Sequence, residues 1–211
     1  MLQQTINCQR FISFEGTEGV GKTTQIKMLS AALKSKAQKV CLTREPGGTI
    51  LGEKIRDILL TTHNKIYLRT ELLLMFAARA EHLEQVILPS LKRGEWVLCD
   101  RYIDSSYAYQ GGGRGIEMND INALENLVCQ KILPRVTFLL DAPINIGLQR
   151  IQLREKLDHF EQQSVDFFKR VRDVYLNRAK KYCHRILLLK AMDTKFKIHR
   201  KILKAIHFND I

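Results

Sequence analysis

The sequence predicts an α/β fold in which a five-stranded parallel sheet is flanked by helices, and two observations carry this prediction. Short apolar runs recur along the chain, at residues 10–15, 39–43, 95–99, 135–140 and 185–189. Long stretches with apolar residues at helical spacing separate these runs. Such alternation of buried strands and helices is typical of a parallel sheet covered by helices. At 211 residues the chain fits a single domain, residues 1–211.

The first predicted strand, residues 10–15, leads into a phosphate-binding loop. Residues 16–23 read Gly-Thr-Glu-Gly-Val-Gly-Lys-Thr and match G-x-x-x-x-G-K-[ST] between a strand and a helix, and the helix would cover about residues 24–36. Glycines let backbone N–H groups surround phosphates, Lys22 neutralises their oxygens, and Thr23 reaches Mg²⁺. The predicted cofactors are therefore ATP and Mg²⁺. The predicted ATP-binding residues are Gly16, Thr17, Glu18, Gly19, Val20, Gly21, Lys22, Thr23 and Thr24.

The second and third predicted strands each end next to an arginine, Arg44 and Arg101. Parallel strands place their carboxyl ends at one edge of the sheet, so both arginines would face the phosphate-binding loop. A planar guanidinium can bind two phosphate oxygens at once. Either arginine alone could be a surface ion pair, but together they favour an anionic acceptor over water. Two glycine clusters, residues 46–48 and 111–113, are predicted to be loops of the site.

Composition and charge limit the class of protein. The chain is 45% hydrophobic and 27% charged, which is ordinary for a globular protein. It lacks a signal-peptide pattern or a run of roughly 18 apolar residues, and its five cysteines form no Cys-x-x-Cys pair. We therefore expect a soluble, cytoplasmic protein. The net charge of +12 lies mostly in residues 150–211, with 16 basic and 7 acidic residues, but phosphate-rich small ligands attract such residues too. We expect no nucleic-acid or membrane partner.

Three segments together resemble bacterial thymidylate kinases: Thr43-Arg-Glu-Pro-Gly-Gly-Thr49, Asp100-Arg101-Tyr102 and Ala108-Tyr-Gln-Gly-Gly-Gly-Arg-Gly115. The resemblance runs from the phosphate-binding loop to about residue 178. It implies the P-loop nucleoside-monophosphate-kinase fold and transfer of the γ-phosphoryl group of ATP to dTMP, giving dTDP and ADP in dTTP synthesis. The implied small-molecule substrates are dTMP and ATP, and homodimers are usual in the family.

The resemblance also assigns roles to residues. Arg44 and Arg101 would hold the dTMP phosphate, Glu18 would meet the 3′-hydroxyl, and Asp100 would act near Mg²⁺ together with Thr23. Arg79 would hydrogen-bond thymine, Ser106 would read the base edge and Tyr109 would pack against the sugar. The predicted substrate-binding residues are Glu18, Arg44, Met75, Phe76, Arg79, Arg101, Ser106, Tyr109 and Gln110.

For some of these positions another residue or another role is also consistent with the sequence. The phenylalanine that stacks on thymine in the family is replaced here by Met75, whose sulfur can also lie on a ring face, while Phe76 is the neighbouring candidate. From the residues alone, Arg79 could instead pair with Glu81 or Glu84 on a helix surface. Tyr109 could be an ordinary core residue.

The phosphate-binding loop contains no arginine to supply charge to the transferring group. One subclass of the family has an arginine at the position of Gly19, and the other carries arginines on a mobile lid; this chain resembles the second. The lid would span about residues 150–161, with Arg150 and Arg154 matching family arginines, although the segment could also be a solvated helix face. An amphipathic helix would follow, with an apolar side made of Phe160, Phe167, Val171, Val174 and Tyr175. The predicted catalytic residues are Lys22, Arg154, Arg150 and Asp100.

Two other functions remain open at this stage. A kinase for another monophosphate or for a deoxynucleoside would share the loop and the Asp-Arg pair, although a nucleoside has no phosphate for both Arg44 and Arg101 to bind. A nucleic-acid-binding or regulatory ATPase could use the basic C-terminal segment, and its polynucleotide binding would depend steeply on salt.

Overall fold

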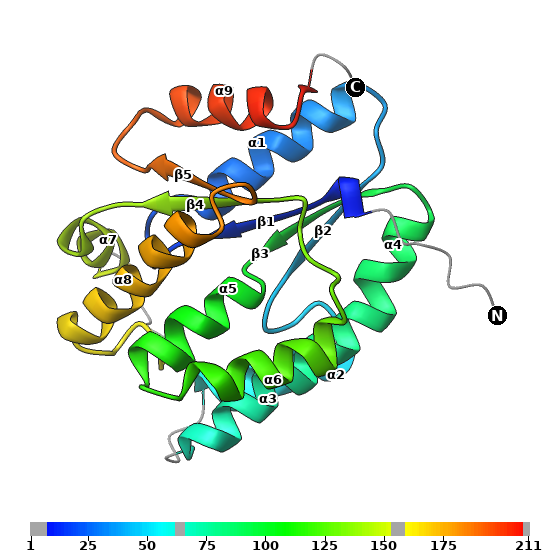
Figure 1. Ribbon diagram of the computed structural model, residues 1–211. Coiled ribbons are helices and arrows are strands. Elements are labelled where there is room, and N and C mark those ends of the chain that lie inside the picture. Colours follow the sequence, from blue (N-terminus) through cyan, green and yellow to red (C-terminus); the bar gives the residue numbers. More distant parts are fainter. Residues whose placement is uncertain (1–7, 62–65, 153–158, 209–211) are drawn as a thin grey trace.

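The computed structural model describes residues 8–61, 66–152 and 159–208, which contain a five-stranded parallel sheet of order β2-β3-β1-β4-β5 (Figure 1). The strands are β1 (Phe11–Glu15), β2 (Val40–Arg44), β3 (Trp96–Asp100), β4 (Val136–Asp141) and β5 (Ile186–Lys190). Every strand begins and ends within one residue of a predicted apolar run. The predicted fold class is therefore confirmed.

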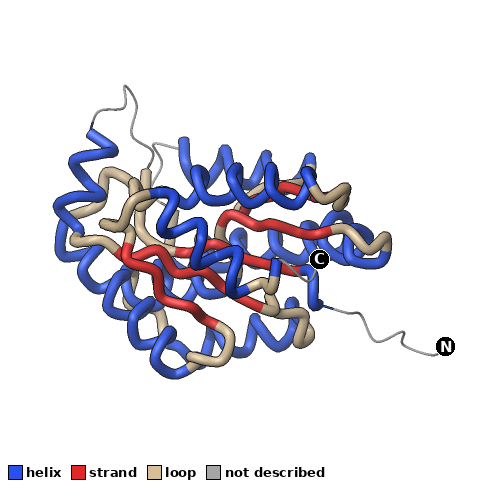
Figure 2. The backbone as a smooth tube through the Cα atoms, turned by 90° about the horizontal axis from the view of Figure 1, so that it is seen from above, coloured by secondary structure: helices blue, strands red, loops and turns tan. Residues whose placement is uncertain are grey.

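Helices cover both faces of the sheet. They are α1 (Lys22–Ser35), α2 (Ile50–Thr61), α3 (Leu68–His82), α4 (Leu88–Lys92), α5 (Ile103–Ser106), α6 (Met118–Cys129), α7 (Ile144–Gln152), α8 (Val165–Lys181) and α9 (Lys195–Ala205). A 3₁₀ turn, η1 (Cys8–Arg10), precedes β1, and two π-helical turns, η2 (Leu83–Ile87) and η3 (Tyr107–Gly113), extend α3 and α5. In Figure 1, α1 and α9 lie above the sheet and α3, α5 and α6 lie below it; Figure 2 shows the strands between the helices from a second direction.

Alternating side chains of the strands build a core on each face. In β1, Ile12 and Phe14 join the cluster beneath α1 and α9, whereas Phe11 joins the cluster with α3 and α6. In β3, Leu98 and Cys99 divide between the two clusters in the same way. Successive residues of a strand point to opposite faces, so fully apolar runs are what a sheet covered on both sides requires.

The carboxyl edge of the sheet gathers the polar residues. β1 ends at Glu15 and continues into the phosphate-binding loop, while Arg44 and Asp100 are register partners of β2 and β3. Arg101 follows with a left-handed backbone conformation, φ +71°, and its N–H donates to the carbonyl of Phe14 at 2.9 Å. This turn brings the Arg101 side chain beside the loop after β1.

The triple glycine at 111–113 is not the loop that the sequence predicts. It belongs to the π-helical turn η3, which packs against α8. A Cβ at Gly112 would lie 2.6 Å from a methyl group of Val174 and 2.8 Å from the carbonyl oxygen of Arg170. The prediction was wrong because close helix packing also requires glycine, and sequence alone does not distinguish the two requirements. The amphipathic helix predicted after the lid is confirmed for Phe167, Val171 and Tyr175, which are buried on α8. Phe160 is also buried but lies in a turn before α8, which begins at Val165.

Candidate active site

The phosphate-binding loop has the conformation that its glycines permit. Gly16, Gly19 and Gly21 have φ of +132°, +72° and +97°, values that residues with a Cβ rarely adopt. Lys22 is buried, and its ammonium donates to the carbonyls of Gly16 at 3.1 Å and Thr17 at 2.9 Å. Burial lowers the pKa of Lys22 to about 8, with the positive charge of Arg101 adding to the effect. An anionic ligand would offset this cost, as expected for a lysine that binds phosphate.

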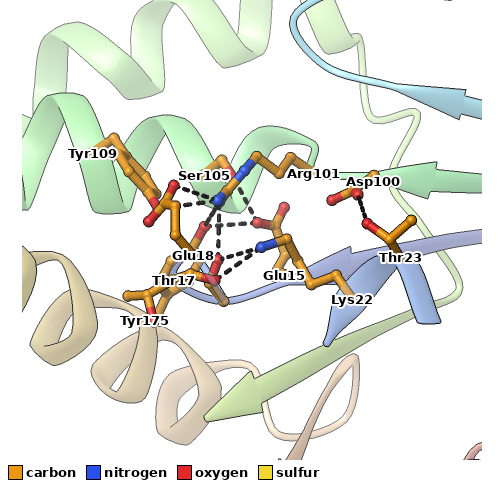
Figure 3. A network of polar contacts seen from close by, with 11 residues as sticks. Glu15, Thr17, Glu18, Lys22, Thr23, Asp100, Arg101, Ser105, Tyr109 and Tyr175 are labelled. Atoms are coloured by element: carbon orange, nitrogen blue, oxygen red, sulfur yellow. Dashed lines mark hydrogen bonds and ion pairs between the residues drawn. The ribbon is translucent and has the colours of Figure 1, made fainter. Parts of the chain in front are cut away.

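Thr23 and Asp100, the two predicted metal ligands, lie next to each other. The Thr23 hydroxyl donates to Asp100 Oδ2 at 3.4 Å, across the gap between α1 and the end of β3 (Figure 3). Within the described ranges, no three His, Cys, Asp or Glu side chains gather as a protein-only metal site. A hydroxyl and one carboxylate do suit Mg²⁺, which usually takes few protein ligands and fills its octahedron with phosphate and water oxygens.

Two pockets open at this edge of the sheet. The larger holds about 1160 Å³ of empty space and is lined by the phosphate-binding loop together with Arg44, Asp100 and Arg150. The smaller holds about 570 Å³, and its walls include the apolar side chains of Met75 and Phe160. Four residues line both pockets: Glu18, Glu45, Arg56 and Arg101. A long, partly apolar ligand could therefore place an anionic group at the junction, where two arginines lie.

Arg101 is held by hydrogen bonds on both of its amino groups (Figure 3). Nη1 donates to the carbonyl of Gly16 at 3.0 Å and to the hydroxyls of Ser105 at 3.3 Å and Tyr175 at 3.2 Å. Nη2 donates to Glu18 at 2.7 Å and to the Tyr109 hydroxyl at 3.1 Å. Burial raises the pKa of Tyr109 well above its usual value, so its hydroxyl stays protonated and donates to Glu18 at 2.7 Å.

Arg79 lies in the interior, and the alternative of a surface pair with Glu81 or Glu84 is wrong. Its Nε donates to Glu45 at 2.7 Å and its Nη1 to the Ser106 hydroxyl at 2.9 Å, and the side chain is 3% exposed. Glu45 is also bonded to His82 Nδ1 at 2.9 Å. Burial alone would raise the pKa of Glu45, but Arg79 and His82 outweigh it and lower the pKa, so the carboxylate stays charged. The Arg79 guanidinium thereby keeps one orientation in the wall of the smaller pocket.

The two candidates for base stacking are in different places. Met75 lines the smaller pocket, whereas Phe76 is 2% exposed and packs in the core, with the Arg79 guanidinium 4.8 Å from its ring centroid. Gln110 also lines the smaller pocket and donates to Glu71 at 3.0 Å. Ser106 accepts its bond from Arg79, and the neighbouring Ser105, rather than Ser106, is part of the pocket wall.

The predicted arginines of the larger pocket differ in their surroundings. Arg44 forms an ion pair with Glu53 at 2.8 Å, and both side chains are largely exposed, at 55% and 40%. Arg150, on α7, donates to the carbonyl of Gly19 at 3.1 Å. Arg154 and residues 153–158 of the predicted lid lie outside the described residues.

Several residues of the site were not singled out from the sequence. Glu45, Arg56 and Ser105 line the pockets, Tyr175 contacts Arg101, and Glu15 accepts hydrogen bonds from Ser105 and Tyr175. A signal existed for Glu15, because a carboxylate at the end of a mostly apolar, buried strand needs partners. Tyr175 gave no such signal, because it continues the apolar stripe of its helix.

None of the helices in the described ranges is both long and apolar enough to cross a bilayer.

Comparison with known proteins identifies the family. A family model described as thymidylate kinase matches residues 14–202. The thymidylate kinase of Nitrosospira multiformis is 48% identical over 197 residues, covering 93% of this chain and 96% of that protein. That of Pseudomonas syringae pv. tomato is 53% identical over 171 residues, covering 81% of each chain. The crystal structure of thymidylate kinase from Ehrlichia chaffeensis superposes with a TM-score of 0.78 at 36% identity, covering 93% of this chain and 97% of the other. The chain belongs to the thymidylate kinase family.

Proposed function

We propose that the chain transfers the γ-phosphoryl group of ATP to dTMP and releases dTDP and ADP, a step of dTTP synthesis. The observation that carries this proposal is Arg101, which lines both pockets and can hold an anionic group between them. ATP would occupy the larger pocket with its phosphates against the loop of residues 16–23. The thymine and deoxyribose of dTMP would enter the smaller pocket.

Phosphoryl transfer needs no covalent intermediate with the protein. The protein therefore contributes mainly by positioning the two substrates and by placing positive charge near the phosphates. Lys22 would neutralise the β- and γ-phosphate oxygens, and Arg44 and Arg101 would hold the acceptor phosphate in line. Bound Mg²⁺, held by Thr23 and Asp100, would add positive charge on the phosphates. Arg101 is preorganised for its role by five hydrogen bonds to other residues of the protein.

Recognition of the nucleoside would fall to the wall of the smaller pocket. Arg79 and Gln110 carry donors for the thymine edge, and Met75 can lie on the ring face. Ser106 would act by holding Arg79 in place. Tyr109 would pack on the deoxyribose, and Glu18 would accept a hydrogen bond from the 3′-hydroxyl.

The positive charge that stabilises the transferring phosphoryl group would come from Arg150 and Arg154, as in the lid-arginine subclass. Two features of the described residues support this assignment. Gly19 has a left-handed φ of +72°, and a Cβ there would lie 2.5 Å from the carbonyl oxygen of Gly147, so an arginine does not fit at this position. Arg150, one helical turn beyond Gly147, instead reaches the loop from outside.

A homodimer is supported by exposed apolar side chains on α2, α3 and α6. Among them, Ile58, Leu73 and Leu127 are 49%, 57% and 69% exposed, and α3 packs against both of the other helices. Exposed apolar side chains on neighbouring helices favour association. Light scattering should give twice the monomer mass, and Leu73→Glu should lower the measured mass toward that of the monomer. A native protein with the mass of a monomer would overturn the dimer proposal.

The five cysteines are free thiols, which supports a reducing cytoplasmic location.

The function is tested by measuring ADP formation with ATP, Mg²⁺ and each of dTMP, dUMP, AMP, CMP and GMP. The expected result is the highest kcat/KM with dTMP. A Lys22→Ala variant purified in parallel controls for contaminating kinases, because it should lose nearly all activity. Equal use of dTMP and the ribonucleotides would contradict the proposed acceptor.

A further inference from the structure

Tyr175 combines a buried ring with a hydroxyl placed among polar atoms of the active site. The residue lies on α8, is 3% exposed and packs against the Tyr109 ring with centroids 6.3 Å apart. Its hydroxyl lies 2.8 Å from Glu15 Oε2, 2.8 Å from the Ser105 hydroxyl and 3.2 Å from Arg101 Nη1 (Figure 3). An oxygen with three such neighbours is not explained by core packing.

Glu15 is the acceptor on which these contacts converge. Its carboxylate is fully buried and accepts hydrogen bonds from the backbone N–H of Tyr102 at 2.7 Å, the Ser105 hydroxyl at 2.6 Å and the Tyr175 hydroxyl at 2.8 Å. Tyr102 and Ser105 follow Arg101, which has its left-handed conformation directly after β3. A non-glycine residue keeps such a conformation only where its surroundings hold it. Glu15 supplies that restraint from the neighbouring strand.

The Tyr175 hydroxyl is a donor toward Glu15 and an acceptor from Arg101. Burial raises the pKa of Tyr175 well above its usual value, so the hydroxyl keeps its proton. A tyrosine hydroxyl has one proton to donate and lone pairs to accept with. Because the Tyr175 hydroxyl donates its hydrogen bond to Glu15, its lone pairs can accept from Arg101 Nη1. The Ser105 hydroxyl has the same arrangement, donating to Glu15 and accepting from Arg101.

The two amino groups of Arg101 therefore differ. Nη1 points at atoms of the protein framework, namely the carbonyl of Gly16 and the hydroxyls of Ser105 and Tyr175. Nη2 points at Glu18 and Tyr109, which both line the smaller pocket. We infer that Tyr175, together with Glu15, is a positioning residue that fixes Arg101 through Nη1 and leaves Nη2 to the acceptor phosphate. This inference rests on the proposed role of Arg101.

The test is a comparison of Tyr175→Phe with Tyr107→Phe. Tyr175→Phe keeps the ring and removes the hydroxyl, so KM for dTMP should rise about threefold to tenfold, the effect of losing one hydrogen bond. KM for ATP and kcat should change less than twofold. Tyr107 is a matched control, since its partly buried hydroxyl donates at 2.6 Å to Glu125 and does not contact Arg101. Tyr107→Phe should leave KM for dTMP unchanged, and melting temperatures of both variants report any general loss of stability.

A double-mutant cycle with Arg101→Ala separates the possible outcomes. If Tyr175 acts through Arg101, Tyr175→Phe should have no further effect on KM for dTMP in the Arg101→Ala background. Additive effects in the cycle, or an equal rise in KM for dTMP in Tyr107→Phe, would overturn the inference while leaving the role of Arg101 intact. If Arg101→Ala itself leaves KM for dTMP unchanged, the proposed role of Arg101 fails, and the inference fails with it.

Discussion

Glu18 Oε1 lies 2.7 Å from Arg101 Nη2, so an acidic residue of the phosphate-binding loop is paired with the arginine that follows β3. The Tyr109 hydroxyl donates to both oxygens of the same carboxylate, at 2.7 Å each. Because Glu18 and Arg101 line both pockets, their ion pair lies at the junction between them. An acceptor phosphate would compete with Glu18 for Nη2. We therefore expect dTMP to replace this ion pair and to leave the carboxylate for the sugar hydroxyl.

Arg44→Ala should weaken the use of dTMP and spare ATP. A charge-assisted contact to phosphate contributes about 1.5–3 kcal/mol, and the lower end applies here because Arg44 is exposed, so KM for dTMP should rise roughly tenfold. Steady-state kinetics and ATP titrations measure the two effects separately. Glu53→Gln is the matched control, because it removes the ion pair of Arg44 and keeps the arginine. An equal loss of ATP affinity in Arg44→Ala would show that this arginine does not face the acceptor.

Tyr109 should exclude ribonucleotides by crowding a 2′-hydroxyl. Its ring is fixed by edge contacts with Phe160 and Phe167, whose centroids are 6.0 and 6.1 Å away, so it cannot easily move aside. Tyr109→Phe keeps the ring and should keep the preference for deoxyribonucleotides, whereas Tyr109→Ala should relax it. The ratio of kcat/KM for dTMP to that for ribothymidine monophosphate measures this preference. An unchanged ratio in the alanine variant would remove Tyr109 from sugar recognition.

The strands and the phosphate-binding loop could be predicted because each depends on residues that lie close together in the sequence. Apolar runs located every strand to within one residue, and the glycine spacing located Lys22 and Thr23. The ion-pair partner of Arg79 could not be predicted from such local patterns. Its partner, Glu45, is 34 positions away and reaches it only through tertiary packing.

The choice between Met75 and Phe76 shows a second limit. Both lie on the same helix, and only packing decides which faces the pocket: Phe76 is buried beneath Arg79, and Met75 lines the pocket. Tyr175 was hidden for the opposite reason, because its ring fits the apolar stripe of α8 and its function lies in one oxygen atom. Hydrophobic periodicity reports on burial and not on what a buried polar atom contacts.

Glu15→Gln should change how stability depends on pH. Burial, with the neighbouring Asp104 adding to it, raises the pKa of Glu15 from 4.5 to about 7, although Ser105, Arg101 and Tyr102 act in the opposite direction. Between these pH values the folded protein binds more protons than the unfolded chain, so the contribution of Glu15 to stability falls as pH rises. Glutamine does not titrate. The melting temperature of Glu15→Gln relative to the native protein should therefore increase from pH 4.5 to pH 7.

The size of this effect is on the order of 1–3 kcal/mol across the window, since each pKa unit corresponds to about 1.4 kcal/mol. Thermal unfolding at pH 5, 6, 7 and 8 measures it. Glu84→Gln, at an exposed position, controls for the change in net charge. Parallel pH curves for the native protein and Glu15→Gln would mean that Glu15 is charged throughout this range.

Two glycines bring α7 against the phosphate-binding loop. A Cβ at Gly19 would lie 2.5 Å from the carbonyl oxygen of Gly147, and one at Gly147 would lie 2.7 Å from that of Glu18. This close approach places Arg150 over the loop, where its Nη1 donates to Gly19 at 3.1 Å. The space that a loop arginine would need is thus occupied by a helix that itself carries an arginine.

Arg150→Ala should lower kcat at least tenfold and change KM for ATP and dTMP far less. The reason is that a supplied arginine acts mainly on charge that develops in the transition state, where such residues can contribute about 10³–10⁵ in turnover. Arg154, outside the described residues, could share the role, so Arg154→Ala and the double variant belong in the same series. Arg150→Lys should rescue poorly, because an ammonium cannot span two phosphate oxygens as a guanidinium does. Gln149→Ala, at the exposed neighbouring position of α7, controls for changes in the helix. If both arginine variants keep near-normal kcat, the charge on the transferring group must come from Lys22 and the bound metal alone.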